Sequence, residues 1–155
     1  MKEQRGFTSF MEEALEEARA AGLRGEVPVG AVLVAPGGRI VARAGNRTRE
    51  LSDPTAHAEV LVIREACRLA GSERLLGYDL YVTLEPCPMC AAAISAARVG
   101  RRYYGASDPK SGGVAVGARV FAHPQCHHVP EVYDGIGAGE AEALLRAFFA
   151  GRRGV

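Results

Sequence analysis

Two short motifs restrict the folds open to this chain more than any other feature of its sequence. His57-Ala58-Glu59 stands at the start of an expected helix, and Pro86-Cys87-Pro88-Met89-Cys90 stands where an expected strand gives way to a helix. Functional sites of α/β folds usually form at the edge of the sheet where such junctions meet. The sequence therefore favours a fold that brings these two helix starts together.

The rest of the chain predicts strands that alternate with helices. Apolar residues at helical spacing predict a first helix over about Ser9–Ala21, and Ser9 and Glu12 have the spacing of a capping box. The later elements are expected at Val27–Val34, Ile40–Ala44, Asp79–Leu84, Arg102–Ala106 and Val129–Tyr133 for strands, and at Ala56–Leu69, Met89–Ala97 and Ala138–Ala150 for helices. This order is typical of a layered α/β domain with helices packed over a central sheet.

The length of 155 residues fits a single domain, and no internal repeat or linker divides residues 1–155. The longest apolar runs are too short to cross a bilayer, so we expect no membrane span. No apolar signal-peptide stretch follows Lys2, Glu3, Gln4 and Arg5 at the N-terminus, which favours a cytoplasmic protein.

Net charge does not single out a nucleic-acid-binding protein, because it is only +1. The distribution of charge says more, since basic residues gather at Arg98, Arg101, Arg102 and Lys110 and again at Arg152-Arg153. Local basic patches of this kind can contact phosphates. Solvated surface charge is an equally good interpretation of these residues on charge alone.

His57, Cys87 and Cys90 have the residue types and spacing of metal ligands. Two cysteines three residues apart on an opening helical turn place both sulfurs on one face. A helix N-terminus carries partial positive charge, which lowers thiol pKa and favours the thiolate that binds a metal. Pro86 and Pro88 restrict φ and help to set the turn into this helix. Two thiolates and one imidazole leave one position of a tetrahedral zinc ion for water, as in catalytic sites.

Glu59 is expected beside this water rather than on the metal. A carboxylate within hydrogen-bond reach can take a proton from the water and deliver it to a leaving amine. A C-x-x-C pair can also be a redox pair or half of a structural zinc site, but the sequence has no second C-x-x-C or H-x-H motif to complete four ligands. H-x-E followed by P-C-x-x-C is the signature of zinc nucleobase deaminases, and the chain matches that template.

At these residues the chain resembles the bacterial tRNA-specific adenosine deaminases of the cytidine deaminase-like superfamily. The matching stretches are Val27–Val34, Gly45–Arg47, Asp53–Glu59, Leu80–Ala91, Gly105-Ala106, Asp108, Lys110, Leu144-Leu145, Phe148-Phe149 and Arg152-Arg153. The resemblance implies an α/β fold of three α/β/α layers with a mixed, mostly five-stranded central sheet, and a homodimer. It also implies one Zn²⁺ per chain held by His57, Cys87 and Cys90, with Glu59 as proton shuttle.

The reaction that the resemblance implies is conversion of the wobble adenosine to inosine in the anticodon stem-loop of a tRNA. Asn46 stands where the family hydrogen-bonds the target base, and Asp108 and Phe149 match positions near the bound anticodon loop. An extruded base needs an amide to read its edge and apolar or aromatic surfaces for its neighbours. Without the resemblance, Asn46 could be a turn residue after a strand, and Phe149 could pack the last helix.

The sequence departs from the family pattern at three places. Lys110–Gly117 lacks the usual Gly-Ser, His127-His128 replaces an expected Asn-His pair, and Ala141 stands where a cysteine is common. We expect these changes at the rim of the substrate site rather than at the metal.

Two other functions remain open at this point. One is deamination of a free base such as guanine or cytosine, since the motif Glu85–Cys90 alone would suit a guanine deaminase. The basic helix end Phe148–Arg153 favours RNA, because a free base has no phosphates to contact. The other is a non-catalytic, zinc-stabilised RNA-binding module, which would have no use for Glu59.

Three further features carry no expected function. Cys126 and the neighbouring His123, His127 and His128 are not expected to bind metal, because adjacent histidines in one short loop point in different directions. Gly135–Gly139 lacks the βαβ context of a dinucleotide loop, so no nucleotide cofactor is expected. Cys67 is expected to be a small buried apolar residue within a helix.

Overall fold

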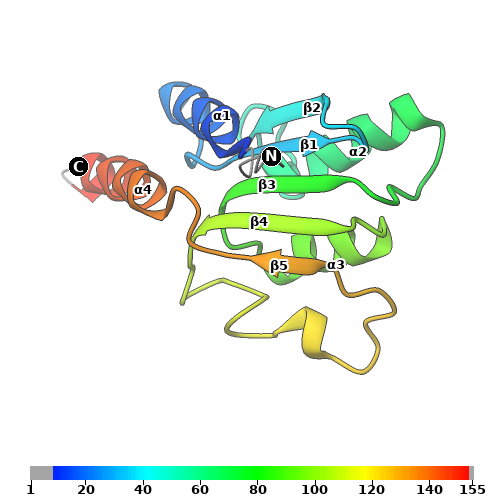
Figure 1. Cartoon of the computed structure of the whole chain (residues 1–155). Coiled ribbons are helices and arrows are strands. Elements are labelled where there is room, and N and C mark those ends of the chain that lie inside the picture. The colour runs from blue at the N-terminus through cyan, green and yellow to red at the C-terminus, as the bar shows by residue number, and fades with distance from the viewer. Residues whose placement is uncertain (1–8, 154–155) are drawn as a thin grey trace, which may run out of the picture.

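Five strands form one mixed sheet in the order β2-β1-β3-β4-β5 in the computed structural model, which describes residues 9–153 (Figure 1). The strands are β1 Gly30–Val34, β2 Ile40–Gly45, β3 Asp79–Leu84, β4 Arg101–Ala106 and β5 Glu131–Tyr133. β1 runs antiparallel to both β2 and β3, whereas β3, β4 and β5 run parallel to one another. The mixed five-stranded sheet expected from the sequence is confirmed.

Helices cover both faces of this sheet (Figure 1). The helices are α1 Met11–Leu23, α2 Ala58–Ala70, α3 Pro88–Ala96 and α4 Ala138–Arg153, with a short 3₁₀ turn, η1, at Val120–Ala122. One core cluster joins α1 and α4 to the sheet through Met11, Leu15 and Ala141, and a second joins α2 and α3 to it through Val62 and Ile94. The expected three-layer α/β/α arrangement is therefore confirmed.

The contact between α1 and β1 depends on a glycine. A Cβ at Gly30 would overlap the carbonyl oxygen of Ala14 and lie 2.5 Å from the amide nitrogen of Ala18. The helix backbone thus rests directly on the strand. After the end of β1, the turn that leads to β2 has Gly37 at φ +100° and Gly38 at φ +93°, a conformation that glycine adopts without strain.

One expected strand boundary and one expected helix cap are wrong for identifiable reasons. β1 begins at Gly30 rather than Val27, because Pro28 has no N–H and the Val29 N–H bonds locally to the Val27 carbonyl at 2.8 Å. The capping box is also absent. Phe10 is the N-cap of α1, and Ser9 Oγ accepts its hydrogen bond from the Met11 N–H at 3.1 Å.

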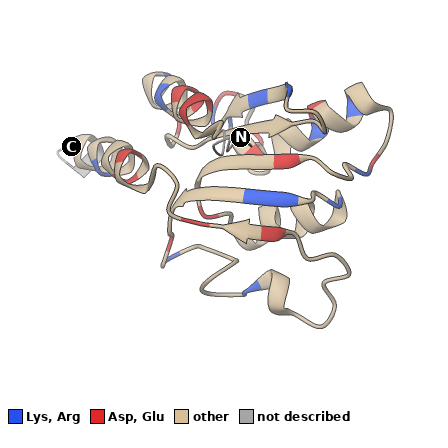
Figure 2. Ribbon diagram, viewed as in Figure 1, with Lys and Arg blue, Asp and Glu red and all other residues tan. Residues whose placement is uncertain are grey.

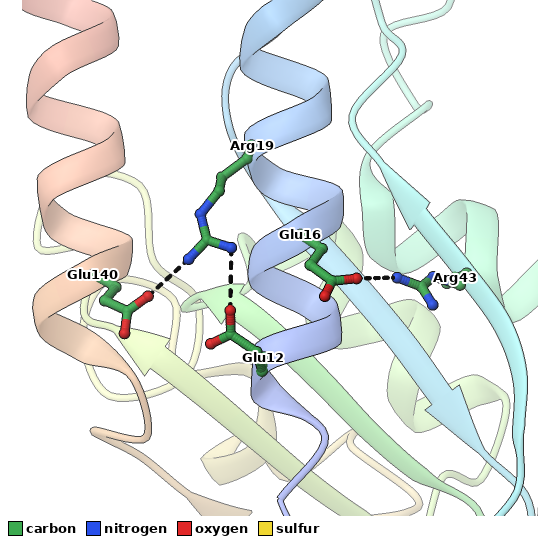
Figure 3. Close-up of polar contacts among 5 residues, drawn as sticks. All are labelled: Glu12, Glu16, Arg19, Arg43 and Glu140. Carbon is green, nitrogen blue, oxygen red and sulfur yellow. Dashed lines mark hydrogen bonds and ion pairs between the residues drawn. The ribbon is translucent and has the colours of Figure 1, made fainter.

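Charged pairs link α1 to its neighbours. Arg19 joins α1 to α4 through Glu140 at 2.8 Å and also pairs with Glu12 at 3.2 Å, while Arg43 of β2 pairs with Glu16 of α1 at 2.9 Å (Figure 3). Exposed pairs of this kind contribute less than about 1 kcal/mol each. They help to orient α4 rather than to stabilise the fold strongly.

Basic and acidic residues are interspersed along the ribbon rather than gathered on one element (Figure 2). This agrees with the net charge of +1. Within residues 9–153, no helix is long and apolar enough to cross a membrane.

Candidate metal centre and active-site pocket

His57 is placed by the turn that leads into α2. Asp53 Oδ1 accepts hydrogen bonds from the Thr55 N–H at 2.8 Å and the Thr55 hydroxyl at 2.7 Å, which closes this turn. His57 is then the N-cap of α2 in an extended conformation, with φ −74° and ψ 150°. Its own side chain makes no capping bond, so the imidazole is available to another partner.

Cys87 and Cys90 occupy the first turn of α3. Cys87 is the N-cap, Pro88 follows at the first helical position, and Cys90 lies fully buried. Proline suits this position because its missing N–H would have no partner within the helix. The two sulfurs and the imidazole nitrogen of His57 thus come from two helix starts at one edge of the sheet, as the motif spacing indicates.

The three donor atoms have the spacing of a zinc site. His57 Nδ1 lies 3.6 Å from Cys87 Sγ and 3.4 Å from Cys90 Sγ. A tetrahedral zinc with metal–sulfur bonds of about 2.3 Å and metal–nitrogen bonds of about 2.0 Å separates sulfur from nitrogen by about 3.5 Å. The donors therefore fit this ion. Among the described residues, no other His, Cys, Asp or Glu joins the cluster.

The protonation of these groups suits a cation at their centre. The hydrogen bond between the two thiols lowers the pKa of Cys87 to about 4, and the contact with His57 adds to this shift against the effect of burial. The same hydrogen bond raises the pKa of Cys90, and so does burial. Hydrogen bonding to Cys87 raises the pKa of His57. Binding of a metal ion requires these donors to be deprotonated, so a metal ion would displace the protons that they share.

Glu59 lies on the first turn of α2, close to the cluster but not within it. Its side chain is buried, and burial is the main cause that raises its pKa. The backbone N–H of Glu59 and the nearby His57 act in the opposite direction. A raised pKa moves a carboxyl group towards the operating pH, which favours general acid–base catalysis.

These groups share a pocket of about 220 Å³ at the sheet edge. Its lining residues are Val27, Val29, Asn46, Thr48, His57, Glu59, Leu84, Glu85, Cys87, Asp108 and Ser111. Five of the seven site residues expected from the sequence are among them, and Cys90 lies behind the wall against His57. The sequence alone assigns no role in the pocket to the aliphatic residues Val27, Val29 and Leu84 or to Glu85, which stands out only as part of the motif Glu85–Cys90.

Phe149 does not line this pocket. It lies on α4, is 45% exposed, and borders a separate depression with Leu145, Arg146 and Ala150. It is therefore not the buried core residue that simple helix packing would give, and its ring stacks edge-on with Phe148 at 5.3 Å.

The basic patch expected from the sequence is only partly available. Arg102 is fully buried, with its guanidinium 4.8 Å from the Tyr104 ring and 5.4 Å from the Phe121 ring, so it cannot meet a phosphate. Arg101 is exposed but pairs with Asp79 at 3.2 Å. The side chains of Arg152-Arg153 lie outside the described residues.

Two of the three departures from the family pattern lie away from the pocket, contrary to expectation. His128 Nε2 is 2.7 Å from the Val99 carbonyl oxygen, and His127 borders a depression beside α3. Ala141 is buried in the core below Gly105. The third departure is where we expected it, since Ser111 lines the pocket.

The remaining candidates from the sequence lie outside the pocket. Cys126, His123, His127 and His128 form no metal-binding group among residues 9–153. Cys67, on α2, is half-buried rather than fully buried, and it packs against the core.

The family model described as the cytidine and deoxycytidylate deaminase zinc-binding region matches residues 6–106. The chain belongs to this deaminase family. The matched span includes both motifs and every ligand of the candidate zinc site.

Individual deaminases resemble the chain over most of its length. The tRNA-specific adenosine deaminase of Agrobacterium fabrum is 63% identical over 146 residues, which cover 94% of this chain and 95% of that protein. A structure from a study of A-to-I editing by tRNA:A34 deaminases at the wobble position of transfer RNA is 64% identical, with a TM-score of 0.86 over 88% of this chain and 98% of that chain. A guanine deaminase from Nitrosomonas europaea has a TM-score of 0.78 over 90% of this chain and 82% of that chain. At 22% identity, this last similarity concerns the fold alone.

Proposed function

We propose that this enzyme converts the wobble adenosine in the anticodon stem-loop of a tRNA to inosine by hydrolytic deamination. The observation that carries the proposal is a pocket in which three donors fit a zinc ion and a buried carboxylate stands beside them. A structural zinc site supplies four protein ligands, whereas a catalytic site leaves one position open. The relatives of more than 60% identity support the choice of substrate.

His57, Cys87 and Cys90 would hold the zinc. When bound, zinc lowers the pKa of a coordinated water to about 7 and so supplies a nucleophile at neutral pH. We assign Glu59 as the group whose carboxylate would accept a proton from the attacking water and deliver it to the departing amine. Its burial in the pocket wall keeps bulk water from competing for that proton.

We assign the substrate contacts to three residues. Asn46 lines the pocket and uses its side-chain oxygen within the protein, which leaves its Nδ2 group to donate to a base edge. Asp108 also lines the pocket, and its Oδ1 accepts hydrogen bonds from the N–H groups of Lys110 and Ser111. Phe149 lies outside the pocket on an exposed helix, where its ring could receive a neighbouring base of the anticodon loop.

Three coarser proposals accompany the reaction. We propose that residues 1–155 form one deaminase domain, because one sheet carries all elements of the pocket. We propose a homodimer, supported by the family resemblance and by a largely apolar depression of about 540 Å³ beside α3. Light scattering after size exclusion should give twice the mass of one chain, and a monomer would contradict the dimer.

We propose that the enzyme acts in the cytoplasm, where its tRNA substrate is found.

The function is tested by a substrate panel. Zinc-loaded enzyme is incubated with an anticodon stem-loop that has adenosine at the wobble position, and with free adenosine, guanine and cytosine. Mass spectrometry of the products should find inosine from the stem-loop and little turnover of the free compounds. Faster turnover of guanine or cytosine would favour a free-base deaminase. Stem-loop binding without any turnover would favour a non-catalytic RNA-binding module.

A further inference from the structure

Glu85 is a buried carboxylate directly after β3, and its hydrogen bonds converge on a single segment. Its side chain belongs to a residue only 2% exposed. Oε1 accepts a bond from the Asp108 N–H at 3.3 Å, and Oε2 accepts bonds from the N–H groups of Val114 at 3.2 Å and Ala115 at 3.0 Å. Bonds from N–H groups to a carboxylate are stronger than bonds between neutral groups. Glu85 thus ties both ends of residues 108–115, here called loop 108–115, to one point.

Two glycines let this loop lie against the motif that carries the cysteines. A Cβ at Gly112 would overlap Oε2 of Glu85 and lie 2.5 Å from the carbonyl oxygen of Asp108. A Cβ at Gly113 would lie 2.6 Å from the Pro88 nitrogen, and the Gly113 N–H bonds to the Pro86 carbonyl at 2.8 Å. Any side chain at either position would push the loop away from Glu85 and from Pro88.

The other side of the loop forms a wall of the pocket. Asp108 and Ser111 both line it, and Asp108 Oδ1 accepts bonds from the N–H groups of Lys110 at 3.2 Å and Ser111 at 3.0 Å. The first turn of the loop is therefore closed by its own hydrogen bonds. The bonds to Glu85 and the bond from the Gly113 N–H to the Pro86 carbonyl attach the loop to the segment that carries the cysteines.

We propose that Glu85 is a positioning residue, which acts through loop 108–115 to hold the pocket wall that receives the RNA. Both of its oxygens accept bonds from backbone N–H groups of the loop, so we assign its effect on the substrate to the position of the loop, although its side chain also borders the pocket. The inference rests on the proposed function for its substrate, but the position of the loop can be measured without turnover.

The test compares zinc-loaded full-length wild type with Glu85→Gln and Gly112→Ala. In Glu85→Gln the amide oxygen can keep the bonds from Val114 and Ala115, while its NH₂ group opposes the Asp108 N–H. Loss of one bond to a charged group should raise KM for the stem-loop about tenfold and leave kcat within about twofold. Gly112→Ala should raise KM similarly, because its methyl group displaces the same loop. Both variants should retain their zinc and show faster amide hydrogen exchange in loop 108–115.

A control variant and an independent readout separate the possible failures. Gly139→Ala adds a methyl group where no atom lies within 4 Å, so its KM and loop exchange should equal those of wild type. A Glu85→Gln enzyme with lower melting temperature but unchanged KM and unchanged loop exchange would overturn the positioning role. If wild type fails to deaminate the stem-loop, the proposed function fails, and loop exchange in the two variants still decides the role of Glu85.

Discussion

Asn46 Oδ1 accepts a hydrogen bond of 2.8 Å from the backbone N–H of Ala58, the first residue of α2. Asn46 follows β2 directly and is 8% exposed. The Asn46 side chain therefore accepts a hydrogen bond from a backbone N–H at the start of α2, where the N-cap His57 makes no side-chain capping bond. The capping oxygen and the Nδ2 group proposed to read the base belong to the same amide, which couples the stability of α2 to substrate recognition.

Asn46→Asp should separate these two functions. The carboxylate keeps an acceptor for the Ala58 N–H and is favoured at a helix N-terminus, but it has no donor for a base. We expect a free energy of unfolding, measured in urea, close to that of wild type, together with strongly reduced deamination. Asn46→Ala should lose both, with about 1 kcal/mol of stability lost. A fully active Asn46→Asp enzyme would remove the base-reading role.

Glu59→Gln should keep the metal and lose turnover. The residue lies outside the donor cluster, so zinc content should remain about one per chain. The amide cannot accept and return a proton, and general acid–base groups contribute about 10²–10⁴-fold to rate. Single-turnover assays on the stem-loop, with zinc measured on the same sample, check both statements. Near-normal rates in the zinc-loaded variant would exclude the assigned role.

Removal of zinc should destabilise the fold around the two helix starts. The metal binds the folded donors and not the unfolded chain, so it contributes its binding free energy to stability. A chelator should lower the melting temperature, and added zinc should restore it. Cys87→Ser should show a smaller effect of chelator than wild type does, whereas Cys67→Ser, half-buried and remote from the cluster, should respond as wild type. Equal melting temperatures with and without zinc would contradict a site of this kind.

Arg102→Met should stabilise the protein. The guanidinium nitrogens are buried without a hydrogen-bond partner among the described residues, and burial lowers the pKa of Arg102 to about 10. A fall from 12.5 to about 10 corresponds to about 3 kcal/mol against the charged form in the folded state, since one unit is about 1.4 kcal/mol. The penalty is present in full at neutral pH. Between about pH 10 and pH 12.5 the unfolded chain binds more protons at Arg102 than the folded chain does, so the free energy of unfolding should rise with pH in this range.

Contacts with Tyr104 and Phe121 offset part of this penalty, at about 1 kcal/mol each. We therefore expect Arg102→Met to raise the free energy of unfolding in urea by about 1 kcal/mol. Arg101→Met is the matched control, because its exposed pair with Asp79 is worth less than about 1 kcal/mol. A loss of more than about 1 kcal/mol in the free energy of unfolding of Arg102→Met would show that the contacts with the aromatic rings outweigh the penalty of burying the charge.

Gly30→Ala should be among the more damaging small substitutions in the chain. Its methyl group would meet the backbone of Ala14 and Ala18, which cannot yield without moving α1 off the sheet. Overpacking of this kind costs about 3 kcal/mol. Gly139→Ala, with open space around the added methyl group, should change stability by less than about 1 kcal/mol or increase it. Equal melting temperatures for the two variants would contradict the close contact of α1 with β1.

The sequence predicts the candidate metal site better than its surroundings. His57, Cys87 and Cys90 belong to motifs in which helix starts and residue spacing carry the chemistry, and the structure brings their donor atoms within 4.8 Å of one another. The order of strands and helices follows from apolar periodicity in the same way. These features are local in the sequence, or they repeat a pattern that has a physical cause.

Other features could not be predicted because their partners leave no sequence pattern. Glu85 is bonded to three backbone N–H groups, and any residue except proline supplies such a group. Arg102 resembles its neighbour Arg101 in the sequence, but Arg101 is exposed at the start of β4, whereas Arg102 and the four residues after it are buried by their tertiary neighbours. Phe149 lies on α4 outside the pocket, and the position of α4 depends on tertiary contacts such as the packing of Ala141 and Leu144 against the core.

X-ray absorption spectroscopy of the purified zinc-loaded enzyme tests the central claim most directly, since it reports the atoms bound to the metal. The account predicts one zinc per chain with two sulfur ligands at about 2.3 Å, one imidazole nitrogen at about 2.0 Å and one oxygen that does not come from the protein. A shell completed by a fourth protein side chain, or the absence of zinc from an active preparation, would contradict it.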